Sequence, residues 1–239
     1  MVIEILFPEF ANLYGDSANV RYLKKCLPTA KFVETSNSEE PYFVRHDIDM
    51  LYIGSMSENA QLITIDKLRP YLEQFKALIE KNILVLCTGN ALELFGSYIL
   101  ADGVKYEALD LFEYHAERKD NVRYNYMFVG EYAGMNIVGH KSQFSLLYGN
   151  FEYPFMKVIR GIGQNIEAKH EGICYKNFYA TYVLGPLLIL NPHFTKYLLN
   201  KLGVDIKLPF EEEMIAAYEN RYHELMQDNA YINIGYHGC

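Results

Sequence analysis

A cysteine stands at the end of a continuous apolar run, directly before a short turn and a second apolar stretch. The run Leu84 to Leu86 is followed by Cys87, Thr88 and Gly89. A sharp strand-to-helix turn projects its side chain clear of the sheet, and the helix N-terminus behind it lowers a thiol pKa and offers N–H groups to an oxyanion. Gly89 permits the tight backbone of such a turn. The spacing predicts a nucleophile at Cys87, and the same position also suits a buried, unreactive core cysteine.

The elements around this turn follow an alternating pattern of apolar strands and amphipathic helices. That pattern predicts an α/β fold with a mixed, mostly parallel sheet flanked by helices. Strands are expected at 2–7, 31–35, 49–54, 83–86 and 177–182, with shorter antiparallel strands between 108 and 138, and helices at 19–26, 65–81, 192–202 and 209–227. Because no low-complexity linker interrupts the pattern, residues 1–239 are predicted to form a single domain.

Composition narrows the class of protein. The 239 residues are 50% hydrophobic and 22% charged, which is enough apolar material for a substantial core. A formal charge of −8 without a basic cluster argues against a nucleic-acid partner. The cysteines, at 26, 87, 174 and 239, show no metal spacing with the histidines and fit a reducing compartment. We therefore expect a cytoplasmic protein with no metal site, no cofactor and no membrane insertion.

Four stretches of the chain match motifs of a known family. They are Asn12–Asp16, Gly54–Gln61, the Cys87 turn, and Thr181–Leu188 followed by Asn191-Pro192. Together they resemble class I glutamine amidotransferases of the cobyric acid synthase-like branch, and are most similar to the glutaminase subunits of lipid II isoglutaminyl synthase. The resemblance covers about residues 3–200 and implies the flavodoxin-like amidotransferase fold. It leaves 204–239 as a C-terminal helical extension.

The resemblance implies a reaction and a partner. Cys87 would attack the side-chain amide of glutamine or a related small amide, and the released ammonia would pass to a synthetase that activates a carboxylate with ATP. Relatives of this size work with a Mur-ligase-like subunit, and this chain has no Gly-x-x-x-x-Gly-Lys-Ser/Thr phosphate loop of its own. The ammonia acceptor stays open between a peptidoglycan precursor and a corrinoid, and chain length favours the first.

The sequence departs from the family pattern where the chemistry is done. The family's closing histidine, which activates the cysteine, is replaced by Leu184, and leucine cannot accept a proton. The oxyanion loop Gly-Gly-Gly-x-Asp-x-x-Gln keeps only Gly54 and Gln61. The glutamine expected four residues after the nucleophile is Ala91, and a further motif, Gly-Phe/Tyr-Glu-x-His, reads 139–143 here without its acid and histidine.

Several side chains remain as candidates for substrate binding. Arg123 matches an arginine of the relatives and could pair with the carboxylate of glutamine. His140 and His193 are possible replacement bases, although each also suits a partly exposed histidine without a role. The full set expected to contact substrate is Gly54, Ser55, Gln61, Thr88, Gly89, Arg123 and Gln143.

The sequence thus leaves enzymatic activity undecided between hypotheses of different classes. The first is a glutaminase subunit that uses Cys87 and supplies ammonia to a cell-wall amidating synthetase. The alternative is an inactive or repurposed amidotransferase-fold subunit that binds or scaffolds. A hydrolase using Cys87 on another substrate meets the same missing base at Leu184, and no substrate-specific motif supports it.

Overall fold

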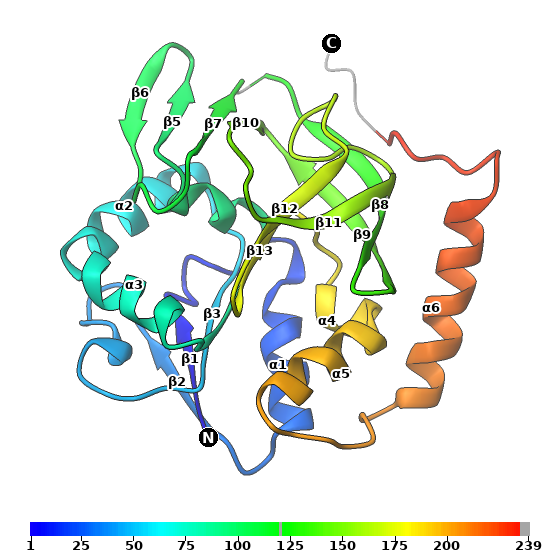
Figure 1. Cartoon of the computed structure of the whole chain (residues 1–239), viewed down its shortest axis with the longest axis horizontal. Coiled ribbons are helices and arrows are strands. Elements are labelled where there is room, and N and C mark those ends of the chain that lie inside the picture. Colours follow the sequence, from blue (N-terminus) through cyan, green and yellow to red (C-terminus); the bar gives the residue numbers. More distant parts are fainter. Residues whose placement is uncertain (120, 235–239) are drawn as a thin grey trace.

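The computed structural model describes residues 1–119 and 121–234 and is built around a nine-stranded mixed sheet (Figure 1). In spatial order the strands are β2 (Lys31–Thr35), β1 (Val2–Leu6), β3 (Met50–Ile53), β4 (Leu84–Thr88), β13 (Phe178–Thr181), β12 (His170–Tyr175), β11 (Pro154–Arg160), β8 (Tyr124–Tyr132) and β9 (Met135–Gln143). Pairing is parallel from β2 to β13 and antiparallel from β13 to β9. This arrangement confirms the predicted α/β fold with a mixed sheet.

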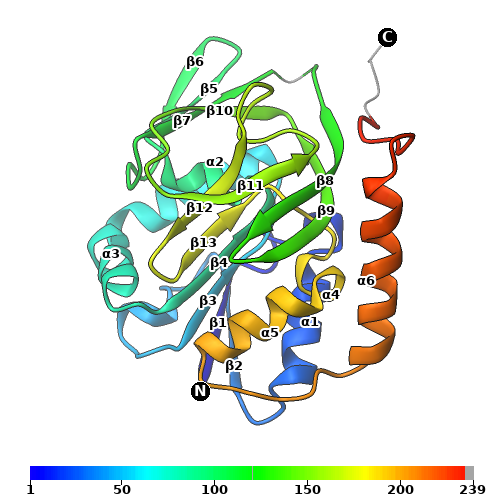
Figure 2. The same ribbon diagram turned by 45° about the vertical axis from the view of Figure 1, so that its right-hand side comes forward.

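Helices cover both faces of this sheet (Figure 2). On one face lie α1 (Ser17–Cys26), α4 (Leu187–Leu190), α5 (Pro192–Lys201) and, over β8 and β9, α6 (Glu211–Met226). On the other lie α2 (Glu58–Leu68), α3 (Leu72–Glu80) and a second sheet in the order β10 (Ser145–Gly149), β7 (Tyr114–Arg118), β5 (Tyr98–Ala101), β6 (Val104–Glu107). Each face buries its own apolar cluster, so the central strands are apolar on both sides, as their sequences predict. No helix in the described part of the chain has the length and apolarity needed to cross a membrane.

Two predicted helices differ from the structure. The stretch 65–81 is not one helix, because α2 ends at Leu68 and a 3-10 turn at Arg69–Tyr71 precedes α3. Pro70 explains the break, since proline lacks the N–H that would continue the helix. The helix expected behind the turn at Cys87 is a buried 3-10 helix, η4 (Gly89–Phe95), and not an α-helix.

The C-terminal extension packs against the antiparallel half of the sheet. Within 204–239 the structure has α6, and after it the segment 232–234 runs along the start of β8. There the Met127 N–H donates to the Ile232 carbonyl at 2.8 Å and the Ile234 N–H to the Asn125 carbonyl at 3.0 Å. Cys239 lies outside the described residues.

A buried ion pair fixes the segment that follows β13. Lys141 on β9 and Glu171 on β12 are both 0% exposed, with Nζ and Oε1 3.7 Å apart. The Glu171 carboxylate accepts hydrogen bonds from Thr181 Oγ1 at 2.6 Å and the Tyr182 N–H at 2.8 Å. Two residues later, the Leu184 N–H donates to the His140 carbonyl at 2.9 Å. The backbone at Leu184 is therefore fixed by hydrogen bonds to strands β9 and β12.

Substitution of Lys141 tests this arrangement. Lys141→Met should lower the free energy of unfolding by about 3–5 kcal/mol, because it leaves the Glu171 carboxylate buried without its cation. Lys24→Met, which removes an exposed pair with Glu34, is the matched control and should cost less than about 1 kcal/mol. Urea unfolding at pH 7 measures both, and equal losses in the two variants would contradict a stabilising role of the buried pair.

Candidate functional site

A small pocket opens at the carboxyl ends of the parallel strands, where α/β sheets commonly bind ligands. Its volume is about 70 Å³. The wall comes from five parts of the chain: residues 13–14, the loop after β3 at 55–58, the turn after β4 at 89–93, residue 123 with 142–145, and residue 184 after β13. The topology therefore brings together segments that lie far apart in the sequence.

The pocket gathers some of the predicted site residues and leaves others behind it. Ser55, Gly89, Arg123, Gln143 and Leu184 line it. The remaining predicted residues, which are buried behind this wall, are Gly54, Gln61, Cys87 and Thr88. Gln61 acts on the wall through its hydrogen bond to the Asn90 carbonyl, and Thr88 acts through Asp16, which also binds the Ser55 N–H.

Cys87 does not have the environment that its sequence context predicts. Its side chain is 0% exposed and belongs to the apolar cluster on the α2 and α3 face. The residue pairs in register with Ile53 on one side and Ala180 on the other, because β4 continues to Thr88. Burial raises the pKa of the Cys87 thiol well above its usual range. The prediction of a projecting thiol with a lowered pKa is therefore wrong.

The sharp turn lies two residues further on, at Gly89. This residue has φ +61°, in the left-handed region that favours glycine. A Cβ atom placed on Gly89 would lie 3.3 Å from Leu184 Cδ2 and would clash with the Ser55 side chain. Position 89, and not position 87, thus faces the position of the family histidine. The sequence carries one sign of this: four residues after Gly89 stands Glu93, close in shape to the family glutamine.

Ser55 fills the space beside Gly89 and is firmly held. Its hydroxyl donates to the Leu13 carbonyl at 2.9 Å, and its N–H donates to the Asp16 carboxylate at 2.8 Å. The same carboxylate accepts a hydrogen bond from Thr88 Oγ1 at 2.5 Å. Burial raises the pKa of Asp16, and these hydrogen bonds oppose the effect. Asp16 therefore ties the loop after β3 to the end of β4.

Asn90 closes the loop over the turn. Its Oδ1 accepts the Met56 N–H at 2.9 Å, and its Nδ2 donates to the Met56 carbonyl at 2.8 Å. Gln61 Nε2 in turn donates to the Asn90 carbonyl at 2.8 Å. In the family this loop helps to form the oxyanion hole, which requires free N–H groups. Here the Met56 N–H is already bonded.

A buried polar group that the sequence did not single out forms part of the pocket wall. Glu93 accepts a hydrogen bond from the Tyr182 hydroxyl at 3.0 Å and lies 3.5 Å from Arg118 Nη2. Arg118 also donates to Gln61 Oε1. Burial raises the pKa of Glu93, and the Arg118 charge opposes this shift. The cluster depends on β7 and η4 meeting in space, which local sequence patterns do not reveal.

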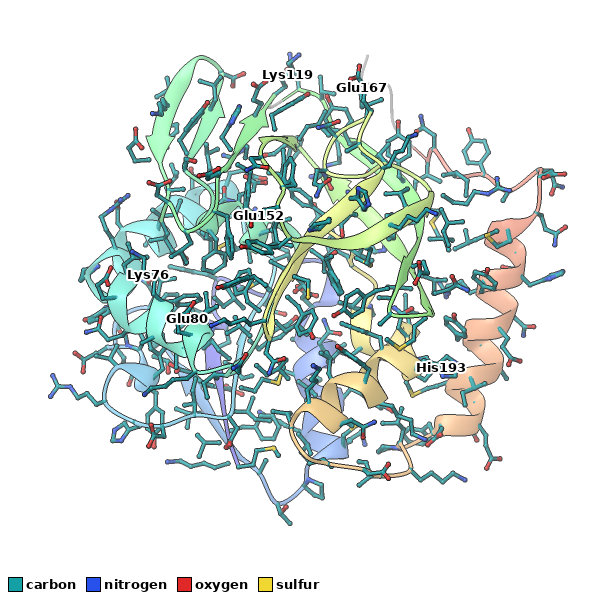
Figure 3. The ribbon with its side chains drawn as sticks, in the orientation of Figure 1. Lys76, Glu80, Lys119, Glu152, Glu167 and His193 are labelled. Carbon is teal, nitrogen blue, oxygen red and sulfur yellow. The ribbon has the colours of Figure 1, made fainter. Side chains whose placement is uncertain are left out.

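No histidine among the described residues lines the pocket. His140 is bridged to Leu184 through its backbone, and burial together with the charge of Arg221 on α6 lowers the pKa of its ring. His193 lies on α5 with its ring against Tyr218 of α6 (Figure 3). Neither histidine stands where a base would be needed. Within residues 1–119 and 121–234, no group of three His, Cys, Asp or Glu could hold a metal ion.

Comparison with known proteins gives consistent results. No protein-family model matches the chain. It is 31% identical over 210 residues to the glutamine-hydrolysing lipid II isoglutaminyl synthase subunit GatD of Staphylococcus aureus, covering 85% of each chain. It is 27% identical over 232 residues to the GatD of Streptococcus pneumoniae, covering 88% of this chain and 85% of that one. A solved glutamine amidotransferase superimposes with a TM-score of 0.54 at 13% identity, over 84% of this chain and 99% of that chain, which shows the fold.

The buried thiol makes a testable contribution to pH-dependent stability. An unfolded thiol ionises near pH ~8.5, whereas burial keeps Cys87 protonated above that pH in the folded chain. The stability from this group is fully present below pH ~8.5 and is lost as pH rises, by about 1.4 kcal/mol per pH unit. Wild type should therefore lose stability relative to Cys87→Ala between about pH 9 and 10.

Urea unfolding from pH 7 to 10 measures this difference. Val85→Ala is the matched control, because Val85 is also 0% exposed on β4 and does not titrate. Its difference from wild type should stay constant over the same range. A pH-independent difference for Cys87→Ala would contradict the buried, protonated thiol.

Proposed function

Because the chain belongs to the GatD family of lipid II isoglutaminyl synthase subunits, we propose that it is an amidotransferase-fold subunit of a complex that amidates a cell-wall precursor. In this proposal the subunit itself does not hydrolyse glutamine. One observation carries the proposal. The turn residue that faces Leu184 is Gly89, so neither a nucleophile nor a base stands at the reacting position.

The chemistry of thioester formation explains why this observation matters. A nucleophile must attack the amide carbon, a base must take its proton, and N–H groups must stabilise the oxyanion. Glycine supplies no nucleophile, leucine takes no proton, and the Met56 N–H is bonded to Asn90. Each loss typically costs about 100-fold or more in rate, although such losses need not add. Together they support a site that binds without reacting.

The proposal includes a partner and a precursor. The names of both relatives refer to a synthase subunit and to lipid II, which favours a peptidoglycan precursor over a corrinoid. A Mur-ligase-like synthetase would activate the carboxylate with ATP, since this chain has no phosphate loop in its sequence. Its part in the complex would then be to bind the synthetase and hold it in a competent state.

Hydrolysis through Cys87 is the competing function, and a direct assay separates the two. The chain, alone and with its synthetase, should release no ammonia from glutamine above the level of a buffer control. The glutamine analogue 6-diazo-5-oxo-norleucine should not label it, because the Cys87 thiol is 0% exposed. Cys87→Ala should behave as wild type. Ammonia release that Cys87→Ala abolishes would refute the proposal.

A reconstruction tests the assignment of the reacting position. Ser55→Gly combined with Gly89→Cys and Leu184→His should place a thiol beside an imidazole, because the removed Ser55 side chain occupies the space that the new Cβ needs. We expect the diazo analogue to label position 89, located by peptide mass spectrometry. The matched control keeps Leu184 and carries only the other two changes. It should react at least about 100-fold more slowly than the triple variant. Labelling at Cys87 in the triple variant would contradict the assignment.

A further inference from the structure

The pocket carries opposite charges on its wall. Arg123 and Glu58 both line it, and within the described residues neither forms an ion pair. The Arg123 guanidinium is stacked 4.5 Å from the centroid of the Phe144 ring, which orients it at the mouth. Glu93 also lines the pocket, but its carboxylate is paired with Arg118 and bonded to Tyr182. The wall therefore has one cation and one carboxylate that lack an ion-pair partner among the described residues, which complements a ligand with both charges, such as a free α-amino acid.

A buried acceptor lies in the same wall. Gln143 is only 5% exposed, and its Nε2 donates to the Ser145 carbonyl at 2.8 Å. Since that carbonyl can only accept, the orientation of the amide is fixed and Oε1 faces away from Ser145. Oε1 has no hydrogen-bond donor within the described residues. A ligand ammonium would supply the donor that this buried oxygen lacks.

The opposite end of the pocket offers no free side-chain hydrogen-bonding group from Leu184, Gly89 or Asn90. Leu184 and Gly89 form its surface, and the Met56 N–H and carbonyl are both bonded to Asn90. A glutamine carboxamide packed against Leu184 would lose hydrogen bonds to water that the leucine side chain does not replace, which costs binding affinity. An apolar side chain has no hydrogen bonds to water to lose. The volume of about 70 Å³ is also far below the roughly 300 Å³ at which pockets for larger ligands begin.

We propose that this pocket binds, without converting it, a free α-amino acid with a short apolar side chain. The carboxylate pairs with Arg123, the ammonium faces Gln143 and Glu58, and the side chain packs against Leu184. The inference rests on the proposed function, because a site without nucleophile or base leaves its ligand intact. Binding stabilises the folded subunit to an extent that depends on the ligand concentration. The stability of the subunit within the complex would therefore follow the concentration of that amino acid.

Calorimetric titration of the full chain with single amino acids tests the ligand class. L-Alanine and L-valine should bind, and L-glutamine should bind at least tenfold more weakly than alanine. N-Acetylalanine and alanine methyl ester, which each remove one charge of the head group, should not bind detectably. Gln143→Met and Arg123→Gln should each weaken alanine binding about tenfold or more, the usual effect of losing a hydrogen bond to a charged group. Phe210→Ser, at a 62% exposed site directly before α6 and outside the pocket lining, is the control and should bind as wild type.

A specificity change separates recognition from a structural role. Asn90→Ala frees the Met56 N–H for a ligand carbonyl, so the affinity for glutamine relative to alanine should rise about tenfold. A purely structural effect would weaken both ligands alike. Failure of every amino acid to bind, or tighter binding of intact glutamine than of alanine in wild type, overturns this inference alone. Conversion of glutamine to glutamate and ammonia overturns the proposed function instead.

Discussion

The buried carboxylate of Asp16 is the contact on which the geometry of this site depends. It accepts hydrogen bonds from the Ser55 N–H, from Thr88 Oγ1 and from Asn19 Nδ2, and so joins the loop after β3, the end of β4 and helix α1. A buried carboxylate is costly unless such donors satisfy it. Because the donors come from three elements, the loop after β3 and the turn after β4 cannot move apart unless Asp16 loses hydrogen bonds. These bonds therefore fix the distance between the loop and the turn.

At that fixed spacing, the residues at 55 and 89 depend on each other. A side chain at 89 would occupy the space that the Ser55 side chain takes, so only one of the two positions can carry a Cβ without rearrangement. The serine uses this space for a hydrogen bond to Leu13, and the glycine keeps the left-handed turn. The glycine at position 89 and the changed loop after β3 are thus a single packing change. Leu184 completes it by placing an apolar side chain against the glycine.

The sequence was sufficient for the fold, but it did not locate the turn that follows β4. Strand 31–35 and the helix from Pro192 follow from apolar spacing and from proline, and the structure has both. The end of β4 could not be located in this way, because Cys87 and Thr88 are as compatible with a buried strand as Leu86. The prediction therefore placed the turn two residues too early. Only the four-residue step from Gly89 to Glu93 indicated the correct register.

The hydrogen bonds that shape this pocket wall could not be predicted from sequence patterns, for a physical reason. Asn90 and Met56 are separated by 34 positions, and each has several possible partners until the fold brings them together. Once formed, the two hydrogen bonds between Asn90 and Met56 and the Gln61 bond to the Asn90 carbonyl satisfy polar groups that would otherwise destabilise the wall. The shape of the wall therefore depends on these hydrogen bonds between the loop after β3, helix α2 and the turn after β4. None of them involves the side chain at position 89 or 184, so the shape of the pocket does not depend on which residues stand at those two positions.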